Sequence, residues 1–192
     1  MLAILAFAAA VAGSVPAFAD HLSLTAPKGS DYYGAGKDAN LTAPTVMTPV
    51  EGDFILAARV HIPFNNLYDG AALVVRADDA HWAKFLIERS RPGVEGVTSS
   101  VVRGDSDDDY HVPFRPGQDT IWLKMTRKGE RYCFYTSEDG KAWTIARDFA
   151  LGTSAPVTIG VEAQSPLGPQ VTADFDHIRL DHRTPADYWQ GE

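Results

Sequence analysis

Short runs of alternating apolar and polar residues, separated by turn-forming residues, occupy the chain from residue 54 onward. Alternation with a period of two predicts β-strands that bury one face and solvate the other. Asp69-Gly70, Pro92-Gly93 and Asp139-Gly140 are typical turn dipeptides between such runs. Strands are therefore predicted at 54–62, 71–77, 82–88, 98–103, 120–127, 131–137, 141–149, 156–164 and 171–180.

No amphipathic helical pattern separates these runs, which excludes a parallel β-α-β architecture because its crossovers are usually helices. Many short strands at nearly regular spacing predict an all-β protein, an antiparallel β-sandwich or, as the alternative, a barrel. We expect one domain over 20–192, with loosely held ends at 20–30 and 183–192. The acidic stretch 105–109 is interpreted as a solvated turn, with a loose calcium site as the alternative.

Side-chain alternation predicts which residues form the core. Within 120–127, Leu123 lies on an apolar face with Ile121 and Met125, whereas Lys124 lies on the polar face. The same reasoning places the apolar alternates of 71–77, 82–88 and 156–164 in the core, and predicts that Lys124 is a surface residue. We also expect 71–77 and 82–88 to pair as a hairpin, because only the short turn from Ala77 to His81 connects them.

The N-terminus carries the pattern of an export signal. Residues 2–12 are an uncharged apolar run, and Ala17-Phe18-Ala19 resembles a cleavage site. The run is too short and too interrupted for a membrane-spanning helix. We therefore expect a signal peptide at 1–19, a mature chain that begins at Asp20, and a secreted or periplasmic protein with no membrane insertion after cleavage.

The net charge and the single cysteine restrict which ligands and cross-links the chain can form. The chain has 17 Lys and Arg against 25 Asp and Glu, a formal net charge of −8. Such an acidic chain without a basic cluster argues against nucleic acid as a partner. Cys133 is the single cysteine, so no intramolecular disulfide and no cysteine-based zinc site can form. The apolar run around Cys133 predicts a buried thiol.

Five segments resemble the motifs of a known family, in the same order along the chain. They are GSDYY (29–33), LYDGAALVVRADDAHWAKFLIE (67–88), SSVVRGDSDD (99–108), YTSEDGKAWTIAR (135–147) and VTIGVEAQSPLG (157–168). These segments are similar to the family named after a regulator of enolase, a domain of unknown function. The resemblance implies a concanavalin A-like lectin/glucanase fold of the jelly-roll type and an association with carbohydrate-related proteins.

The chain departs from that family's motifs at three positions. The family has Trp where this chain has Tyr33, Gln where it has Gly70, and an aromatic residue where it has Asp108. If these positions belong to a ligand site, the resemblance implies that the site is altered in this protein.

Catalytic motifs are not evident. Glucanases of this fold place their two carboxylates close together along one strand, a spacing that the chain lacks, and glycoside hydrolysis needs such a pair. Asp105, Asp107 and Asp109 have the first spacings of a calcium loop, but Tyr110 and Pro116 stand where the loop requires Gly and Glu. The six histidines show no zinc-binding pattern. No catalytic residue, metal site or cofactor is therefore predicted.

A carbohydrate-binding face is the remaining prediction. Aromatic rings offer sugars a flat apolar surface, and charged side chains hydrogen-bond to hydroxyl groups. The residues predicted to share this face are Arg76, Trp82, Lys84, Glu88, Trp122, Glu162 and Gln164. The sequence favours a non-catalytic module that binds a glycan. The alternatives are a glycoside hydrolase or lyase, and a structural or protein-interaction domain.

Overall fold

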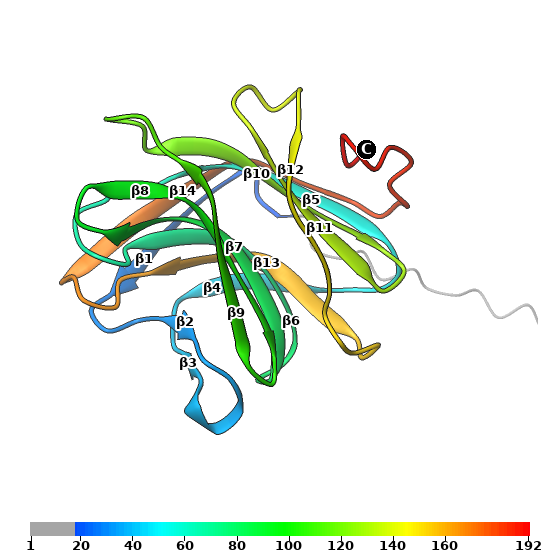
Figure 1. Ribbon diagram of the computed structural model, residues 1–192, viewed down its shortest axis with the longest axis horizontal. Helices are drawn as coiled ribbons and strands as arrows, with labels where there is room; N and C mark the ends of the chain where they lie inside the picture. Colours follow the sequence, from blue (N-terminus) through cyan, green and yellow to red (C-terminus); the bar gives the residue numbers. More distant parts are fainter. Residues whose placement is uncertain (1–17) are drawn as a thin grey trace, which may run out of the picture.

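Two antiparallel β-sheets pack face to face in the computed structural model, which describes residues 18–192 (Figure 1). The first sheet contains, in spatial order, β1 (His21–Pro27), β14 (Gln170–Asp181), β5 (Phe54–His61), β10 (Thr120–Lys128), β11 (Arg131–Ser137) and β12 (Thr144–Ala150). The second sheet contains β4 (Thr45–Val50), β13 (Val157–Gln164), β6 (Gly70–Asp78), β7 (His81–Arg91), β8 (Val94–Arg103) and β9 (Ser106–Pro113). The predicted antiparallel β-sandwich is confirmed.

A small excursion projects from the second sheet. Strands β2 (Tyr32–Tyr33) and β3 (Asn40–Leu41) pair with each other, and a 3-10 turn at Gly36–Asp38 connects them (Figure 1). No helix within residues 18–192 has the length and apolar character needed to cross a bilayer. Most of the expected signal peptide, residues 1–17, lies outside the described residues.

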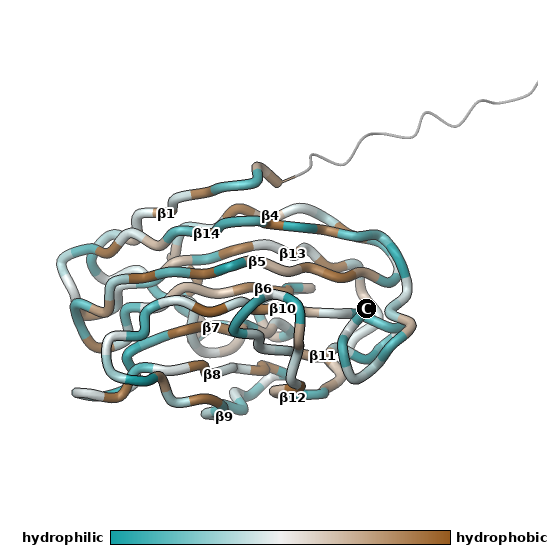
Figure 2. The backbone as a smooth tube through the Cα atoms, turned by 90° about the horizontal axis from the view of Figure 1, so that it is seen from above, coloured by the Kyte–Doolittle hydropathy of each residue, from teal (hydrophilic) through white to brown (hydrophobic). Residues whose placement is uncertain are grey.

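The core lies between the two sheets, and side-chain alternation predicted it correctly. Leu123 of β10 is completely buried, as are Leu73 of β6 and Phe85 of β7. Phe85 stacks on Phe134 of β11, in the opposite sheet, with ring centroids 4.7 Å apart. Hydrophobic and hydrophilic residues alternate along the strands in Figure 2. The predicted pairing of 71–77 with 82–88 is also confirmed, as the β6–β7 hairpin.

The acidic stretch is a strand and not the predicted turn. Residues 106–109 open β9, which pairs with β8 so that Asp108 lies opposite Ser100. Only one side of β9 is paired within the described chain, because β9 is the last strand of its sheet. Charged side chains on an edge strand discourage pairing with another chain. The acidic composition that suggested a solvated turn is thus explained by the position of β9 at the edge.

Both ends of the described chain are held, contrary to the expectation of loose ends. At the N-terminal end, β1 pairs with β14 along its whole length. Side chains add to this pairing, because His21 Nδ1 lies 2.6 Å from Asp176 Oδ1 and Thr25 Oγ1 lies 2.9 Å from Thr172 Oγ1.

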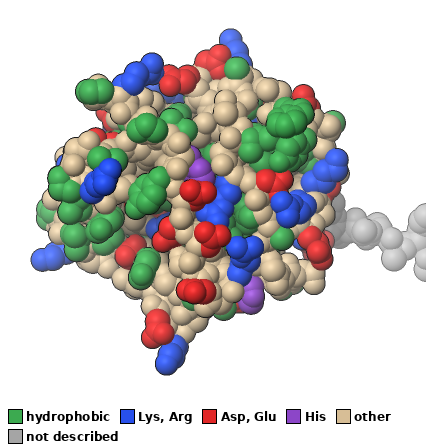
Figure 3. All heavy atoms as spheres, viewed as in Figure 1, with side chains coloured by type: hydrophobic (Ala, Val, Ile, Leu, Met, Phe, Trp, Pro, Cys, Tyr) green, Lys and Arg blue, Asp and Glu red, His purple; other side chains and the backbone are tan. Residues whose placement is uncertain are grey.

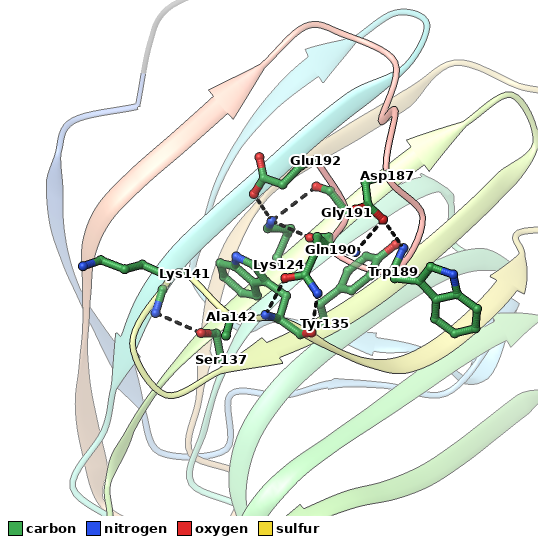
Figure 4. A network of polar contacts seen from close by, with 12 residues as sticks. Lys124, Tyr135, Ser137, Lys141, Ala142, Asp187, Trp189, Gln190, Gly191 and Glu192 are labelled. Carbon is green, nitrogen blue, oxygen red and sulfur yellow. Dashed lines mark hydrogen bonds and ion pairs between the residues drawn. The ribbon is translucent and has the colours of Figure 1, made fainter.

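The C-terminal segment, residues 186–192, lies across the outer face of the first sheet and covers Lys124 (Figure 4). Lys124 Nζ donates to the carbonyl oxygens of Gln190 and Gly191, at 2.9 and 3.2 Å, and pairs with the Glu192 carboxylate. The ammonium also lies 4.0 Å from the ring centroid of Trp143. The prediction that Lys124 is a surface residue is therefore wrong: alternation directs it away from the core, but a second layer of chain buries it.

Candidate ligand-binding site

A pocket of about 470 Å³ lies on the outer face of the second sheet, opposite the core. Its floor comes from three strands. Lys84, Leu86 and Glu88 of β7 alternate onto this face, Thr98 and Ser100 of β8 lie beside them, and Gln164 comes from the end of β13.

The pairing register explains why these side chains lie together. In an antiparallel sheet, directly paired residues place their side chains on the same face. Lys84 pairs with Ser100, and Ser100 pairs with Asp108, so these three residues form one row across β7, β8 and β9. Glu88 lies in a second row between Gly70 and Gly96. Neither glycine leaves an opening there, because an added Cβ would lie 3.1 Å from Gln164 Cγ at Gly70 and 2.5 Å from Val112 O at Gly96.

Exposed aromatic side chains form the rim of the pocket. Tyr33 of β2 is 59% exposed, Tyr68 before β6 is 42% exposed, and Tyr110 of β9 is 70% exposed. Leu167, in the loop after β13, completes this apolar rim. Three separate segments of the chain thus each place a tyrosine ring at the same opening.

Tyr68 adopts a backbone conformation that is rare for a residue with a side chain. Its φ is +63°, in the left-handed region. Two hydrogen bonds maintain it: Tyr68 N donates to Arg89 O at 2.8 Å, and Gln164 Nε2 donates to Tyr68 O at 3.0 Å. Gln164 Oε1 in turn accepts from Lys84 Nζ at 2.7 Å. The buried floor therefore fixes the position of a rim tyrosine, and strained residues of this kind occur preferentially at functional sites.

The pocket carries a mixed charge pattern in which acids predominate. Asp31, Glu88, Asp108 and Asp109 line it, and Lys84 is the one cation among the described lining residues. Burial raises the pKa of Asp31, although the nearby Lys84 and the Tyr32 amide lower it by smaller amounts. Acidic and basic side chains are also interspersed near the centre of the face in Figure 3, between groups of hydrophobic side chains.

Three of the predicted site residues, Lys84, Glu88 and Gln164, line the pocket together. Arg76 and Glu162 share their sheet face but lie outside the pocket lining. Arg76 pairs with Asp79. Glu162 is completely buried, and neither carboxylate oxygen has a hydrogen-bond partner among the described residues. Burial raises the pKa of Glu162 to about 8, because desolvation outweighs the opposing effect of Lys84.

The two predicted tryptophans do not form an exposed platform. Trp82 lies on the predicted face but is 1% exposed, because the β2–β3 excursion covers it. Tyr32 packs edge-on against the Trp82 indole, with ring centroids 4.9 Å apart and planes at 90°. Trp82 therefore belongs to a second small core, with Ala72, Val74 and Leu86 among its members.

Trp122 lies in the other sheet and is absent from the pocket. Alternation correctly directs it away from the core, but β10 belongs to the first sheet, so its outer face is on the opposite side of the molecule. Trp122 stacks there on His177, with ring centroids 5.5 Å apart. Sequence alternation identifies the face of a strand but not the sheet to which the strand belongs.

Sequence reasoning missed the rim residues, although a signal for them was present. Tyr33 and Asp108 line the pocket, and Gly70 lies opposite Glu88 beside it. These are the three positions at which the chain departs from the family motifs that it resembles. Tyr68 and Tyr110 carried no comparable signal, because a tyrosine in a loop or on an edge strand is common in any sandwich.

The comparisons with known proteins agree with the fold. The family described as "Protein of unknown function (DUF1349)" matches residues 15–183. A curated relative from Saccharomyces cerevisiae, "Regulation of enolase protein 1", is 33% identical over 113 residues, which cover 59% of this chain and 56% of that protein. The match thus spans little more than half the length of this relative.

Solved structures show the same architecture. A functionally unknown protein from Saccharomyces cerevisiae is 25% identical, has a TM-score of 0.74, and is aligned over 86% of this chain and 91% of its own. A xylan beta-1,4-xylosidase from Bacillus halodurans C-125 is 15% identical, with a TM-score of 0.68 over 84% of this chain and 33% of the enzyme. At that identity the likeness shows the fold alone.

Proposed function

Because the chain belongs to the family described as Protein of unknown function (DUF1349), we propose its function from the pocket itself: the protein binds a glycan there and does not cleave it. The observation that supports this most is the combination of a rim of exposed tyrosines with a buried polar floor. Aromatic rings pack against the apolar faces of sugar rings, and fixed polar groups orient the hydroxyls.

The floor offers both hydrogen-bond donors and acceptors. Lys84 Nζ uses one donor on Gln164, and the Glu88 carboxylate accepts from Ser90 Oγ at 3.1 Å, so each keeps further hydrogen-bonding capacity. Thr98 and Ser100 add hydroxyl groups beside them. A ligand rich in hydroxyl groups matches such a floor better than an apolar ligand does.

Binding can be tested with a glycan array, followed by calorimetry on the glycans that bind. Tyr110→Ala and Tyr33→Ala should each weaken binding more than tenfold, about 1.4 kcal/mol or more, without a large change in melting temperature. Trp189→Ala is the matched control, because Trp189 is 71% exposed but lies in the C-terminal segment, outside the pocket lining. Equal binding by all three variants would contradict the proposal.

A glycoside hydrolase or lyase is the second candidate, and the raised pKa of Asp31 is the observation that favours it. Glycosidases pair one protonated carboxyl with one ionised carboxylate, and the pocket holds several carboxyl groups. Release of new reducing or unsaturated ends from a bound glycan, abolished by Asp31→Asn, would establish this activity. If no glycan binds at all, a structural or protein-interaction role becomes the better account.

We propose in addition that residues 1–19 form a cleaved signal peptide and that the protein is secreted or periplasmic. The apolar run ending in Ala17-Phe18-Ala19 supports cleavage before Asp20, and β1 begins at His21, directly after this site. N-terminal sequencing of protein isolated from its host should therefore begin at Asp20. Recovery of a chain with Met1 intact would contradict export by this route.

A further inference from the structure

Three carboxylates around the pocket, those of Asp31, Glu88 and Asp108, form no ion pair with any residue in 18–192. The nearest arginines are occupied elsewhere: Arg76 pairs with Asp79, while Arg103 and Arg147 both pair with Asp107.

Hydrogen bonds satisfy these carboxylates only in part. Asp108 Oδ1 accepts from Ser106 Oγ at 3.0 Å, Glu88 Oε1 from Ser90 Oγ at 3.1 Å, and Asp31 Oδ1 from the Tyr32 amide at 2.8 Å. Within the described chain, the second oxygen of each has no partner. Lys84 lowers the pKa of Asp31 and so compensates its charge in part, whereas the carboxylates of Glu88 and Asp108 have no cationic partner within the described chain and are available to a ligand.

The single lysine does not neutralise this rim. Lys84 is 5% exposed and its ammonium donates to Gln164 Oε1. Lys84 and Asp108 lie in the same cross-strand row with Ser100 between them, so two strand spacings, about 10 Å, separate their backbones. The buried, unpartnered Glu162 carboxyl lies on the same face of the sheet as Lys84, two strands away. The positive charge is thus engaged by Gln164 in the floor, whereas the carboxylates of Glu88 in the floor and Asp108 on β9 have no cationic partner within the described chain.

We propose that the pocket discriminates among glycans by charge, and that it takes an amino sugar with a protonated amine in preference to the neutral sugar or the uronic acid of the same backbone. This inference rests on the proposed glycan binding. A cation near unpaired carboxylates is favoured by Coulomb attraction, and an anion is disfavoured. The tyrosine rings of the rim also favour the amino sugar, because the face of an aromatic ring attracts an ammonium group.

The test uses three β-1,4-linked trisaccharides that share one backbone and differ in a single charged or neutral substituent per sugar ring: those of glucosamine, glucose and glucuronic acid. Calorimetry is done at mildly acidic pH, where the amine is protonated. At low salt the glucosamine trimer should bind more tightly than the glucose trimer by on the order of fivefold, as one close charge pair in water gives. The glucuronic acid trimer should bind most weakly, and added salt should reduce the differences.

A double variant assigns the preference to the pocket. Glu88→Gln with Asp108→Asn removes two negative charges and keeps side chains of the same size, so the preference for the glucosamine trimer over the glucose trimer should decrease. Glu51→Gln with Asp105→Asn changes the net charge equally at exposed positions outside the pocket lining, and should leave the preference intact.

The outcomes separate this inference from the proposed function. Equal binding of the three sugars, tightest binding of the uronic acid, or equal effects of the two double variants would overturn the charge preference while glycan binding stands. Failure of all three sugars to bind, together with a negative glycan array, would overturn both proposals.

Discussion

Glu162 is a carboxyl group that the fold removes from water without giving it a partner. It is completely buried on β13, and neither oxygen has a hydrogen bond to a described residue. Its pKa is raised from 4.5 to about 8, mainly by desolvation; Lys84 opposes this shift, and Asp31 and Glu88 add to it. The folded protein therefore keeps a proton on Glu162 at neutral pH, whereas the unfolded chain releases it.

The consequence is a fall in stability with rising pH. Between pH 4.5 and about 8 the folded state binds one proton more than the unfolded state, so the free energy of unfolding decreases as pH rises through this window. Glu162→Gln removes this dependence. In urea unfolding, the difference in the free energy of unfolding between the variant and the parent should shift in favour of the variant by about 1 kcal/mol or more from pH 5 to pH 8. Glu51→Gln, at an exposed position, should show no such gain, and parallel pH profiles for Glu162→Gln and the parent would refute the assignment.

Lys124 is a second residue whose environment the alternation pattern does not predict, because the C-terminal segment buries it. Lys124→Ala should cost about 1–3 kcal/mol, because it leaves the buried acceptors of the C-terminal segment without a donor. Leu123→Ala should cost about 2–5 kcal/mol, because Leu123 is completely buried in the core.

Urea unfolding measures both costs. Lys124→Met is the control that keeps most of the packing against Trp143 and removes the donor. A cost for Lys124→Ala below a few tenths of a kcal/mol would show that the contacts of Lys124 with the C-terminal segment contribute nothing to stability.

At the scale of elements, the C-terminal segment is bound much as a separate peptide would be. Gln190 exchanges two hydrogen bonds with the backbone of Trp143, at 3.0 and 3.4 Å, and Tyr135 Oη donates to Tyr188 O at 2.8 Å. Gly191 lies against the Tyr135 ring with a φ of +63°. A side chain at residue 191 would both strain the backbone and meet this ring, since an added Cβ would lie 2.8 Å from a ring carbon.

Gly191→Ala should therefore displace the segment and expose Trp143. The expected results are increased quenching of tryptophan fluorescence by iodide and a lower midpoint of urea unfolding. Gly117→Ala is the matched control, because Gly117 also has a positive φ, +80°, but an added Cβ would have no neighbour within 4 Å. Gly117→Ala should therefore introduce backbone strain without a steric contact. Identical behaviour of the two variants would mean that Gly191 makes no specific contact with Tyr135.

Most of the long strands could be predicted from sequence, and the missed strands are very short or lie at the edges of sheets. The nine predicted runs are all strands, because each combines apolar alternation with turn residues at its ends. The two-residue strands β2 and β3 were missed, as were β1, β4 and β9. Strands β1, β4 and β9 lie at sheet edges and each bury at most two residues, so the signal of a buried face is weak. The unpredicted docking of residues 186–192 depends on a surface that exists only after folding.

At the scale of the whole molecule, the pocket could not be predicted, because the alternation pattern does not determine the order of the strands in a sheet. In the sheet, β13 lies between β4 and β6, although both of those strands precede it in the chain by more than 75 residues. That order brings Gln164 to the same opening as Lys84 and Tyr68. The sequence therefore predicts which side chains point outward, whereas the topology decides which of them meet.

The two sheets are also joined by polar contacts at the edge formed by β12 and β9. Arg147 of β12 donates from Nη1 to Ser99 Oγ and to Asp107 O, both at 3.0 Å, and its Nη2 lies 2.6 Å from Asp107 Oδ2. Its side chain is 11% exposed. Arg103 reaches the same Asp107 oxygen at 3.3 Å, but from within the second sheet and with a side chain that is 43% exposed.

This shared acceptor allows a matched test of the link between the sheets. Arg147→Leu should cost about 1–3 kcal/mol, because it removes a largely buried donor and leaves the buried Ser99 hydroxyl with His111 as its remaining partner, at 2.8 Å. Arg103→Leu removes an exposed pair with the same carboxylate and should cost less than about 1 kcal/mol. Urea unfolding gives both values, and hydrogen exchange at β9 and β12 should rise in the Arg147 variant but not in the Arg103 variant. Equal costs would show that apolar packing alone holds this edge together, and that Arg147 contributes no more than a surface charge.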